Sequence, residues 1–334
     1  MRWHRRRWWL AIGIIALALL ALASLAVGSR PIPLATVVAA LRAYDPGNDL
    51  HLVVWQLRVP RLLTAVLAGA ALGLAGAIMQ AITRNPLAEP GLLGINAGAA
   101  VAVVLGVTLL GLTRPVHYAG LSALGAGLAG AVVFLLGRAR ETGTNPVRLV
   151  LAGAGLSIVL GAITGIMVLN ASPIAFDNFR HWAAGSVEGA SFEVALILAV
   201  GVAAGFGVAL PIVGGLNVLA LGQELGKALG ATPRTIWLSA CLAVMLLAGA
   251  ATAAAGPISF VGLIAPHLAR ALVGPDHRWI LPGSALFAAL LLLGADVIGR
   301  VVAAPSEVAA GIVAALLGGP FFITAVRRFR VSRP

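Results

Sequence analysis

Long runs without a charged residue alternate with short charged segments along the whole chain. Nine runs of at least 17 residues contain no Asp, Glu, Lys or Arg. They are 8–29, 62–83, 90–113, 115–137, 149–176, 194–223, 235–269, 279–295 and 308–326. A membrane-spanning helix needs about 20 mainly apolar residues. The runs lack the period-two alternation of a transmembrane β-barrel, so the pattern predicts an all-α polytopic membrane protein.

The run 235–269 is too long for one crossing. As a single helix its 35 residues would extend about 52 Å at 1.5 Å per residue, whereas the hydrocarbon core is about 30 Å thick. Gly256 and Pro257 lie near its middle, and proline removes a helical hydrogen bond. Two crossings, the second of them short, bring the predicted total to ten.

The distribution of Lys and Arg also favours ten crossings. With the N-terminus inside, ten crossings place 16 of the 23 basic residues inside and seven outside, whereas nine crossings give 11 inside and 12 outside. Basic residues are enriched in cytoplasmic loops, so we expect both termini in the cytoplasm. Residues 1–9 resemble the start of a signal peptide, but the following apolar run is longer than a signal core and ends without a small-x-small cleavage pattern.

Composition agrees with a membrane protein. The chain is 60% hydrophobic and 10% charged, whereas soluble domains carry about 25% charge. The net charge of +12 is explained by topology signals, and no nucleic-acid partner is predicted because the basic residues are not interleaved with aromatics. The single Cys241 excludes a disulfide, and His267 and His277 have poor spacing for metal ligands. We therefore predict neither a metal site nor a cofactor.

The stretch 57–94 combines features that recur along the chain. Arg58 and Arg61, separated by Pro60, precede the apolar run 62–83 and are expected near a helix start. Cations there oppose the helix macrodipole, so they need a partner, either lipid phosphate or a carboxylate of an outside protein. A proline-rich elbow follows. It contains Arg84, Asn85, Pro86 and Pro90.

Small residues four apart predict close helix packing at two places. Gly69 and Gly73, with Gly76 following, lie in the second crossing, and Gly161 and Gly165 lie in the fifth. Such spacing lets helix backbones approach without lipid between them. We expect tight packing at both places.

Asp296 is an acid inside an apolar crossing, four residues before Arg300. Inserting an acid into lipid costs roughly 2.5–3.5 kcal/mol, so a partner is expected. An i,i+4 ion pair satisfies both groups. The alternative is a proton relay through Asp296.

The longest inner loop, about 211–235, is apolar but divided into short pieces. Its glycines are Gly215, Gly222, Gly226 and Gly230. The pieces are too short to span a membrane and too apolar for a free linker. We expect two short helices on the cytoplasmic face, which either cover helix ends or dock a soluble partner.

Taken together, these stretches resemble the permease subunits of the FecCD/BtuC-like family of ABC importers, which carry iron-siderophores, heme or cobalamin. The resemblance covers nearly the whole chain, and the order and spacing of the stretches make it specific. The matching stretches are 57–61, 79–80, 85–94, Trp182 with Gly185 and Ser186, 260–267 with Arg270, 274–278, Asp296 with Arg300, Gly311 and 320–322.

The resemblance implies a BtuC-like type II importer fold in one permease domain, residues 1–334, in the bacterial cytoplasmic membrane. It also implies a homodimer, or a heterodimer with a paralogue, two cytoplasmic ATPase subunits and an outer substrate-binding protein. Membrane lipid would surround the permease.

The resemblance also implies roles for individual residues. Docking of the binding protein would fall to Arg58, Arg61 and Arg300. ATPase coupling would fall to Gly222, Glu224, Lys227, Leu229 and Gly230. The inner gate would be at Thr144, Asn145 and Pro146. Structural roles would fall to Pro60, Asn85, Pro86, Pro90, Pro266, His267 and Asp296. The chain departs from the family pattern at Gln223, Gly226 and Ala309.

The chain has no recognisable nucleotide site. Its nearest approach to a P-loop, from Gly222 to Ala228, is one residue short and lacks the Ser or Thr. We therefore predict a transport subunit rather than an enzyme, with an iron(III)-siderophore as the first choice of substrate and heme or cobalamin as the alternative. A proton-coupled secondary transporter would need titratable groups in mid-membrane, and an intramembrane enzyme would need a catalytic motif such as HExxH, which is absent.

Overall fold

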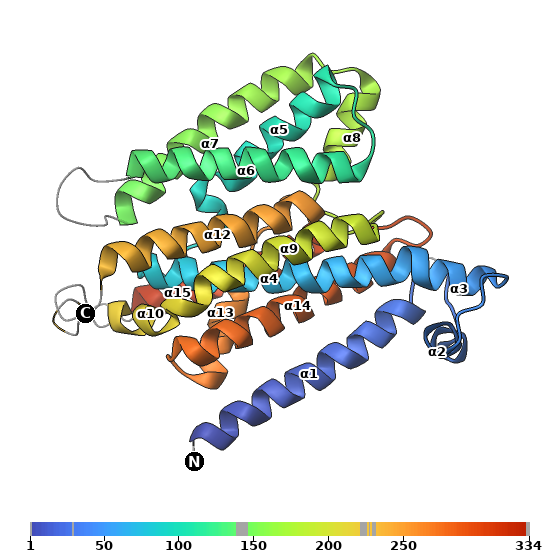
Figure 1. Cartoon of the computed structure of the whole chain (residues 1–334), viewed down its shortest axis with the longest axis horizontal. Helices are drawn as coiled ribbons and strands as arrows, with labels where there is room; N and C mark the ends of the chain where they lie inside the picture. Colours follow the sequence, from blue (N-terminus) through green and yellow to red (C-terminus); the bar gives the residue numbers. More distant parts are fainter. Residues whose placement is uncertain are drawn as a thin grey trace.

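The computed structural model describes residues 2–28, 30–137, 146–220, 226, 228 and 232–331. Every regular element in these ranges is helical (Figure 1). The α-helices are α1 (Arg2–Ala26), α2 (Leu34–Arg42), α3 (Asp49–Val53), α4 (Val59–Thr83), α5 (Ile95–Leu109), α6 (Pro115–Gly137), α7 (Pro146–Leu169), α8 (Pro173–Ala183), α9 (Phe192–Ala209), α10 (Val213–Ala220), α12 (Pro233–Ala255), α13 (Val261–Val273), α14 (His277–Val302) and α15 (Ala310–Val331). A π-helical turn covers Val54–Arg58, and 3₁₀ turns cover Pro90–Leu93 and Leu210–Ile212.

The helices of the described ranges match the predicted crossings. Seven helical segments are long and apolar enough to cross a membrane, and they contain α1, α4, α6, α7, α9, α12 and α14. Three shorter apolar helices, α5, α13 and the first part of α15, correspond to the remaining crossings. The run 235–269 divides as predicted, because α12 ends at Ala255 and α13 begins at Val261.

The bundle has two distinct ends. α1 begins at the end of the bundle where α10 also lies (Figure 1, left), and we call this the terminal end. The opposite, distal end carries α2, α3 and α8 (Figure 1, right). α5, α6, α7 and α8 form a group on one side of α12, whereas α1 lies against α14 on the other side (Figure 1).

The helix that carries Arg58 and Arg61 begins earlier than predicted. It starts at Asp49 as α3, passes through the π turn Val54–Arg58 and continues as α4. Pro60 has no N–H to donate to the preceding turn, and the wider π turn adjusts the backbone just before it. The expectation that both arginines lie near a helix start is therefore wrong, because they project from the interior of a continuous helix.

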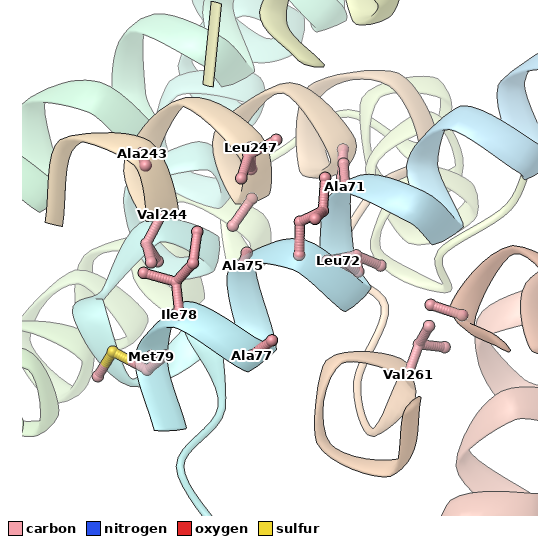
Figure 2. Packing of buried hydrophobic residues seen from close by; sticks show 14 of the residues in the cluster. Ala71, Leu72, Ala75, Ala77, Ile78, Met79, Ala243, Val244, Leu247 and Val261 are labelled. Atoms are coloured by element: carbon pink, nitrogen blue, oxygen red, sulfur yellow. The ribbon is translucent and has the colours of Figure 1, made fainter. Parts of the chain in front are cut away.

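α4 lies at the centre of the bundle and is packed by small residues. A Cβ added at Gly69 would lie 2.6 Å from a carbonyl oxygen of α14, and one at Gly73 would overlap another. A Cβ at Gly76 would overlap a carbonyl oxygen of α13. The close packing predicted for this part of α4 is confirmed. On the α12 side, Ile78 packs among fully buried residues such as Val244 and Leu247 (Figure 2).

The same glycine spacing on α7 has a different outcome. Apart from the backbone of α7 itself, no atom of the described residues lies within 4 Å of a Cβ placed at Gly161 or Gly165. Only 11% of the apolar stretch that would cross the membrane in α7 is buried inside the protein. These two glycines therefore lie on an exposed surface. The expectation of tight packing is therefore wrong for this pair within the single chain.

Candidate functional site

Five charged side chains gather at the distal end, where α4 and α14 pack together. They are Arg58, Arg61, Asp296, Arg300 and Glu307. We call this set the arginine cluster. It brings together all three cations that the resemblance assigns to docking, with the acid expected to pair with Arg300.

Asp296 lies at the centre of the arginine cluster and is 1% exposed. The Nη2 and Nε atoms of Arg61 donate to its Oδ1 atom at 2.7 and 3.0 Å. Arg300 forms an ion pair with its Oδ2 atom, which confirms the pairing predicted from the i,i+4 spacing. Arg61 also forms an ion pair with Glu307, with 2.7 Å between Nη1 and Oε2. One guanidinium thus links two carboxylates from different parts of the chain.

The other contacts of the arginine cluster fix the end of α1. Arg300 donates to the carbonyl oxygen of Ser24 at 2.9 Å and to that of Val27 at 3.1 Å. Arg58 donates to the carbonyl oxygen of Leu25 at 2.6 Å and to that of Arg30. The last carbonyls of a helix lack helical partners, and cations are favourable there. Two arginines from other helices therefore cap the C-terminal end of α1.

The three arginines are turned into the protein rather than toward solvent. Arg61 keeps 13% of its side chain exposed, and Arg58 and Arg300 are 8% and 3% exposed as residues. Three guanidinium groups against two carboxylates leave the cluster with a net charge of +1. Sequence reasoning missed the partnership of Arg61 with Asp296 and Glu307, because these residues lie far apart along the chain.

The elbow between α4 and α5 is fixed by its polar residues. Asn85 accepts a hydrogen bond from the backbone N–H of Leu87 at 2.9 Å, a local turn typical of asparagine. Pro90 begins a 3₁₀ turn. Glu89 accepts a hydrogen bond from the N–H of Phe260 at 2.8 Å, next to the start of α13. Burial raises the pKa of the Glu89 carboxyl, although the N–H of Phe260 opposes the shift.

His267 and His277 occupy separate environments. The His267 ring, next to Pro266 in α13, packs edge-on against Phe321 of α15 with 5.6 Å between ring centroids. His277 begins α14 and contacts Asn217 instead. Within the described ranges, no three His, Cys, Asp or Glu side chains are grouped to hold a metal ion.

Asn217 of α10 contacts the start of α14 through its whole side-chain amide. Its Nδ2 atom donates to Oδ1 of Asp276 at 2.7 Å, and its Oδ1 atom lies 2.8 Å from both the backbone N and Nδ1 of His277. Asp276 also caps α14 by accepting from the N–H of Arg278 at 3.0 Å. We call Asn217, Asp276 and His277 the α10–α14 joint. No pattern in the sequence around Asn217 predicts this contact.

The pKa of Asp276 agrees with this arrangement. Burial alone would raise the pKa, but hydrogen bonds from the Arg278 N–H and the Asn217 amide, with the charges of Arg278 and Arg6, hold it below its usual range. A second contact fixes α10 at its other side. Arg84, in the left-handed conformation at the end of α4, donates to the carbonyl oxygen of Leu219 at 2.9 Å.

Several predicted site residues lie outside the described residues. They are Thr144, Asn145, Gly222, Glu224, Lys227, Leu229 and Gly230. Pro146 begins α7 at the terminal end (Figure 1). The assignment of all these residues, Pro146 included, to the inner gate or to ATPase coupling stays a prediction.

Comparisons with known proteins agree over nearly the whole chain. Residues 16–328 match the FecCD transport family. The ferric enterobactin transport system permease FepD of Escherichia coli is 42% identical over 90% of each chain. The Fe(3+)-citrate import permease YfmD of Bacillus subtilis is 39% identical over 91% of this chain and 90% of its own. The hemin permease HmuU of Yersinia pestis is 38% identical over 86% of each. A metal-chelate type ABC transporter, solved facing inward, superposes with a TM-score of 0.83 at 29% identity, over 96% of this chain and 98% of that one.

Proposed function

The chain belongs to the FecCD transport family, and from this membership we propose that it is the permease subunit of an ABC importer for an iron(III) chelate. An iron(III)-siderophore is the preferred cargo, because similar permeases are named for ferric enterobactin, Fe(3+)-citrate and iron(3+)-hydroxamate. The hemin permease among the relatives supports heme as the second candidate. Residues 1–334 would act as a single permease domain.

Membership of the family also supports the proposal that the permease works with partner subunits. Two cytoplasmic ATPases would supply the energy, and an outer binding protein would deliver the chelate. The permease would pair with a second copy or with a paralogue in the bacterial cytoplasmic membrane. We place the terminal end in the cytoplasm, because ten crossings with both termini inside put most basic residues there. Residues 211–235 would then face the ATPases, and Thr144, Asn145 and Pro146 would lie at the inner gate.

The function is tested by transport in liposomes that contain the permease, its ATPase and its binding protein. We expect uptake of the iron(III) chelate only when ATP is present, and no ATP hydrolysis by the purified chain alone. Uptake that persists without ATP while a proton gradient is kept would instead identify a secondary transporter. The pairing of Asp296 with two arginines weighs against that alternative, because it leaves the carboxylate engaged rather than available as a proton relay.

We propose that the binding protein docks over the arginine cluster as a whole. Arg58, Arg61 and Arg300 are held by partners in the same chain, so their charge would act mainly through the net +1 of the cluster, with Arg61 the most exposed of the three. Acidic groups on the binding protein would complement this charge. The arginines would in addition hold the distal ends of α1, α4 and α14 together.

Replacing Glu307 with Gln should strengthen docking at low salt. The change raises the net charge of the cluster from +1 to +2, because it removes one of the two carboxylates and with it the ion pair between Arg61 and Glu307. Exposed charge pairs contribute about 0.2–1 kcal/mol, so we expect up to about fivefold tighter binding of the binding protein in a surface-binding assay. The gain should fade at high salt. The exposed Glu188, changed to Gln, serves as the control with the same charge change. Equal gains from both variants would argue against docking at the cluster.

A further inference from the structure

α10 is held to other helices by specific contacts rather than by general packing. Arg84 binds the carbonyl oxygen of Leu219 and so ties the helix to the end of α4. Asn217 ties it to the start of α14. A Cβ at Gly215 would lie 2.6 Å from the Ile236 side chain, so α10 also lies close against α12. α10 is thus fixed to three helices at the terminal end.

The contact made by Asn217 is unusually complete. The amide oxygen faces two nitrogen atoms of His277, and the amide nitrogen donates to Asp276. Asp276 is itself the N-cap of α14, where a carboxylate satisfies an N–H that has no helical partner. The amide therefore holds the cap of α14 and the first residue of the helix together. A displacement of α10 must either move the start of α14 or break all of these contacts.

α14 extends from this joint to the arginine cluster. The helix contains 26 residues, which corresponds to about 39 Å at 1.5 Å per residue. Its first residue, His277, contacts Asn217, whereas Asp296 and Arg300 near its other end pair within the cluster. Along its length it is packed against α4 at Gly69 and Gly73, where the backbones touch. A single helix therefore connects the two polar sites of the protein.

We propose that Asn217 is a positioning residue that couples α10 to α14, so that a movement imposed on α10 from the cytoplasm is transmitted to α14. The inference rests on the proposed function, in which partner ATPases act on residues 211–235. Asn217 contacts neither cargo nor nucleotide in this role. Through its amide contacts, the start of α14 moves together with α10.

The test compares transport with ATP consumption in liposomes that contain permease, ATPase and binding protein. With Asn217→Ala, we expect ATP hydrolysis to continue while the chelate taken up per ATP hydrolysed falls at least tenfold. Asn170→Ala is the matched control, because the exposed Asn170 amide, directly after the end of α7, donates to the carbonyl oxygen of Ile166 in that helix. The control should keep the wild-type ratio.

A reciprocal exchange separates coupling from simple stability. Asn217→Asp places two carboxylates against each other and should lower the ratio. Asp276→Asn keeps an oxygen that can accept from the Asn217 amide and from the Arg278 N–H, so this variant should change the ratio little. The double variant Asn217→Asp with Asp276→Asn again pairs one amide with one carboxylate and leaves an oxygen facing the His277 N–H. It should recover at least half of the wild-type ratio. The thermal midpoint of each purified variant shows which of them remain folded.

The outcomes distinguish this inference from the proposed function. If the wild-type assembly takes up no chelate with ATP, the proposed function fails. If the wild-type assembly transports and folded Asn217→Ala keeps its ratio, only the coupling role is wrong. A folded double variant that stays as uncoupled as Asn217→Asp would also overturn the role.

Discussion

Replacing Asp296 with Ala is expected to lower the free energy of unfolding by about 3–5 kcal/mol, the usual effect of removing one partner from a buried ion pair. Asp296 is the shared partner of Arg61 and Arg300, and it is buried. Without it, the partners that the described residues leave to Arg300 are oxygen atoms at the end of α1, and Arg61 keeps Glu307. Two guanidinium groups then remain in a region with little water, which is why the effect should be large.

The measurement is reversible unfolding of the purified permease in detergent, with folded yield as a second readout. Asp177→Ala is the matched control, since Asp177 and Arg180 form an exposed pair on α8 with side chains 59% and 63% exposed. Exposed pairs contribute about 0–1 kcal/mol, so the control should unfold nearly like the wild type. An Asp296→Ala protein as stable as this control would show that water or lipid headgroups already satisfy the two arginines.

Features set by local sequence were predictable. The apolar runs gave the crossings, since length and apolar character alone decide whether a helix suits the membrane core. The division at Gly256 and Pro257 was predicted because chain length exceeded the membrane thickness. The pairing of Asp296 with Arg300 followed from the helical spacing of four residues. Each of these inferences needs only residues that are neighbours along the chain.

Features set by residues far apart in the sequence were not predictable in this way. Arg61 and Asp296 are separated by 235 positions, and nothing local indicates that one guanidinium serves two acids. Asn217 contacts His277 across 60 positions, and a single asparagine in an apolar loop forms no motif from which this contact could be predicted. The start of the helix at Asp49 was missed because Pro60 signals a helix start, whereas a π turn before it lets the helix continue.

The glycine spacing shows the same limit. Gly69 with Gly73 and Gly161 with Gly165 are indistinguishable as motifs. The first pair contacts the backbone of α14, whereas the second contacts no other helix in the part of the chain that the structure describes. Which helix faces the glycines is decided by the arrangement of the whole bundle. The motif indicates that two helix backbones can approach closely. The arrangement of the helices in the fold decides where they do.

This difference leads to the second large effect, expected for Gly76→Ala. A Cβ at Gly76 would overlap the carbonyl group of Gly262, and a Cβ at Gly262 would lie 2.8 Å from the carbonyl oxygen of Leu72. The backbones of α4 and α13 are therefore in direct contact, with no flexible side chain that could move aside. Overpacking costs typically 1–3 kcal/mol. Because the obstacle here is backbone, we expect about 3 kcal/mol, at the upper end of that range.

The matched control for Gly76→Ala is Gly161→Ala, an identical change in the middle of another spanning helix. Its Cβ has no neighbour from another helix within 4 Å among the described residues, and alanine is the better helix former by about 1 kcal/mol. The control should therefore unfold at the same or slightly higher denaturant, while Gly76→Ala unfolds well before the wild type. Equal stability of the two variants would mean that α13 can move away from α4 without loss. The placement of the elbow and of Phe260 against Glu89, which depends on α13, would then need to be revised.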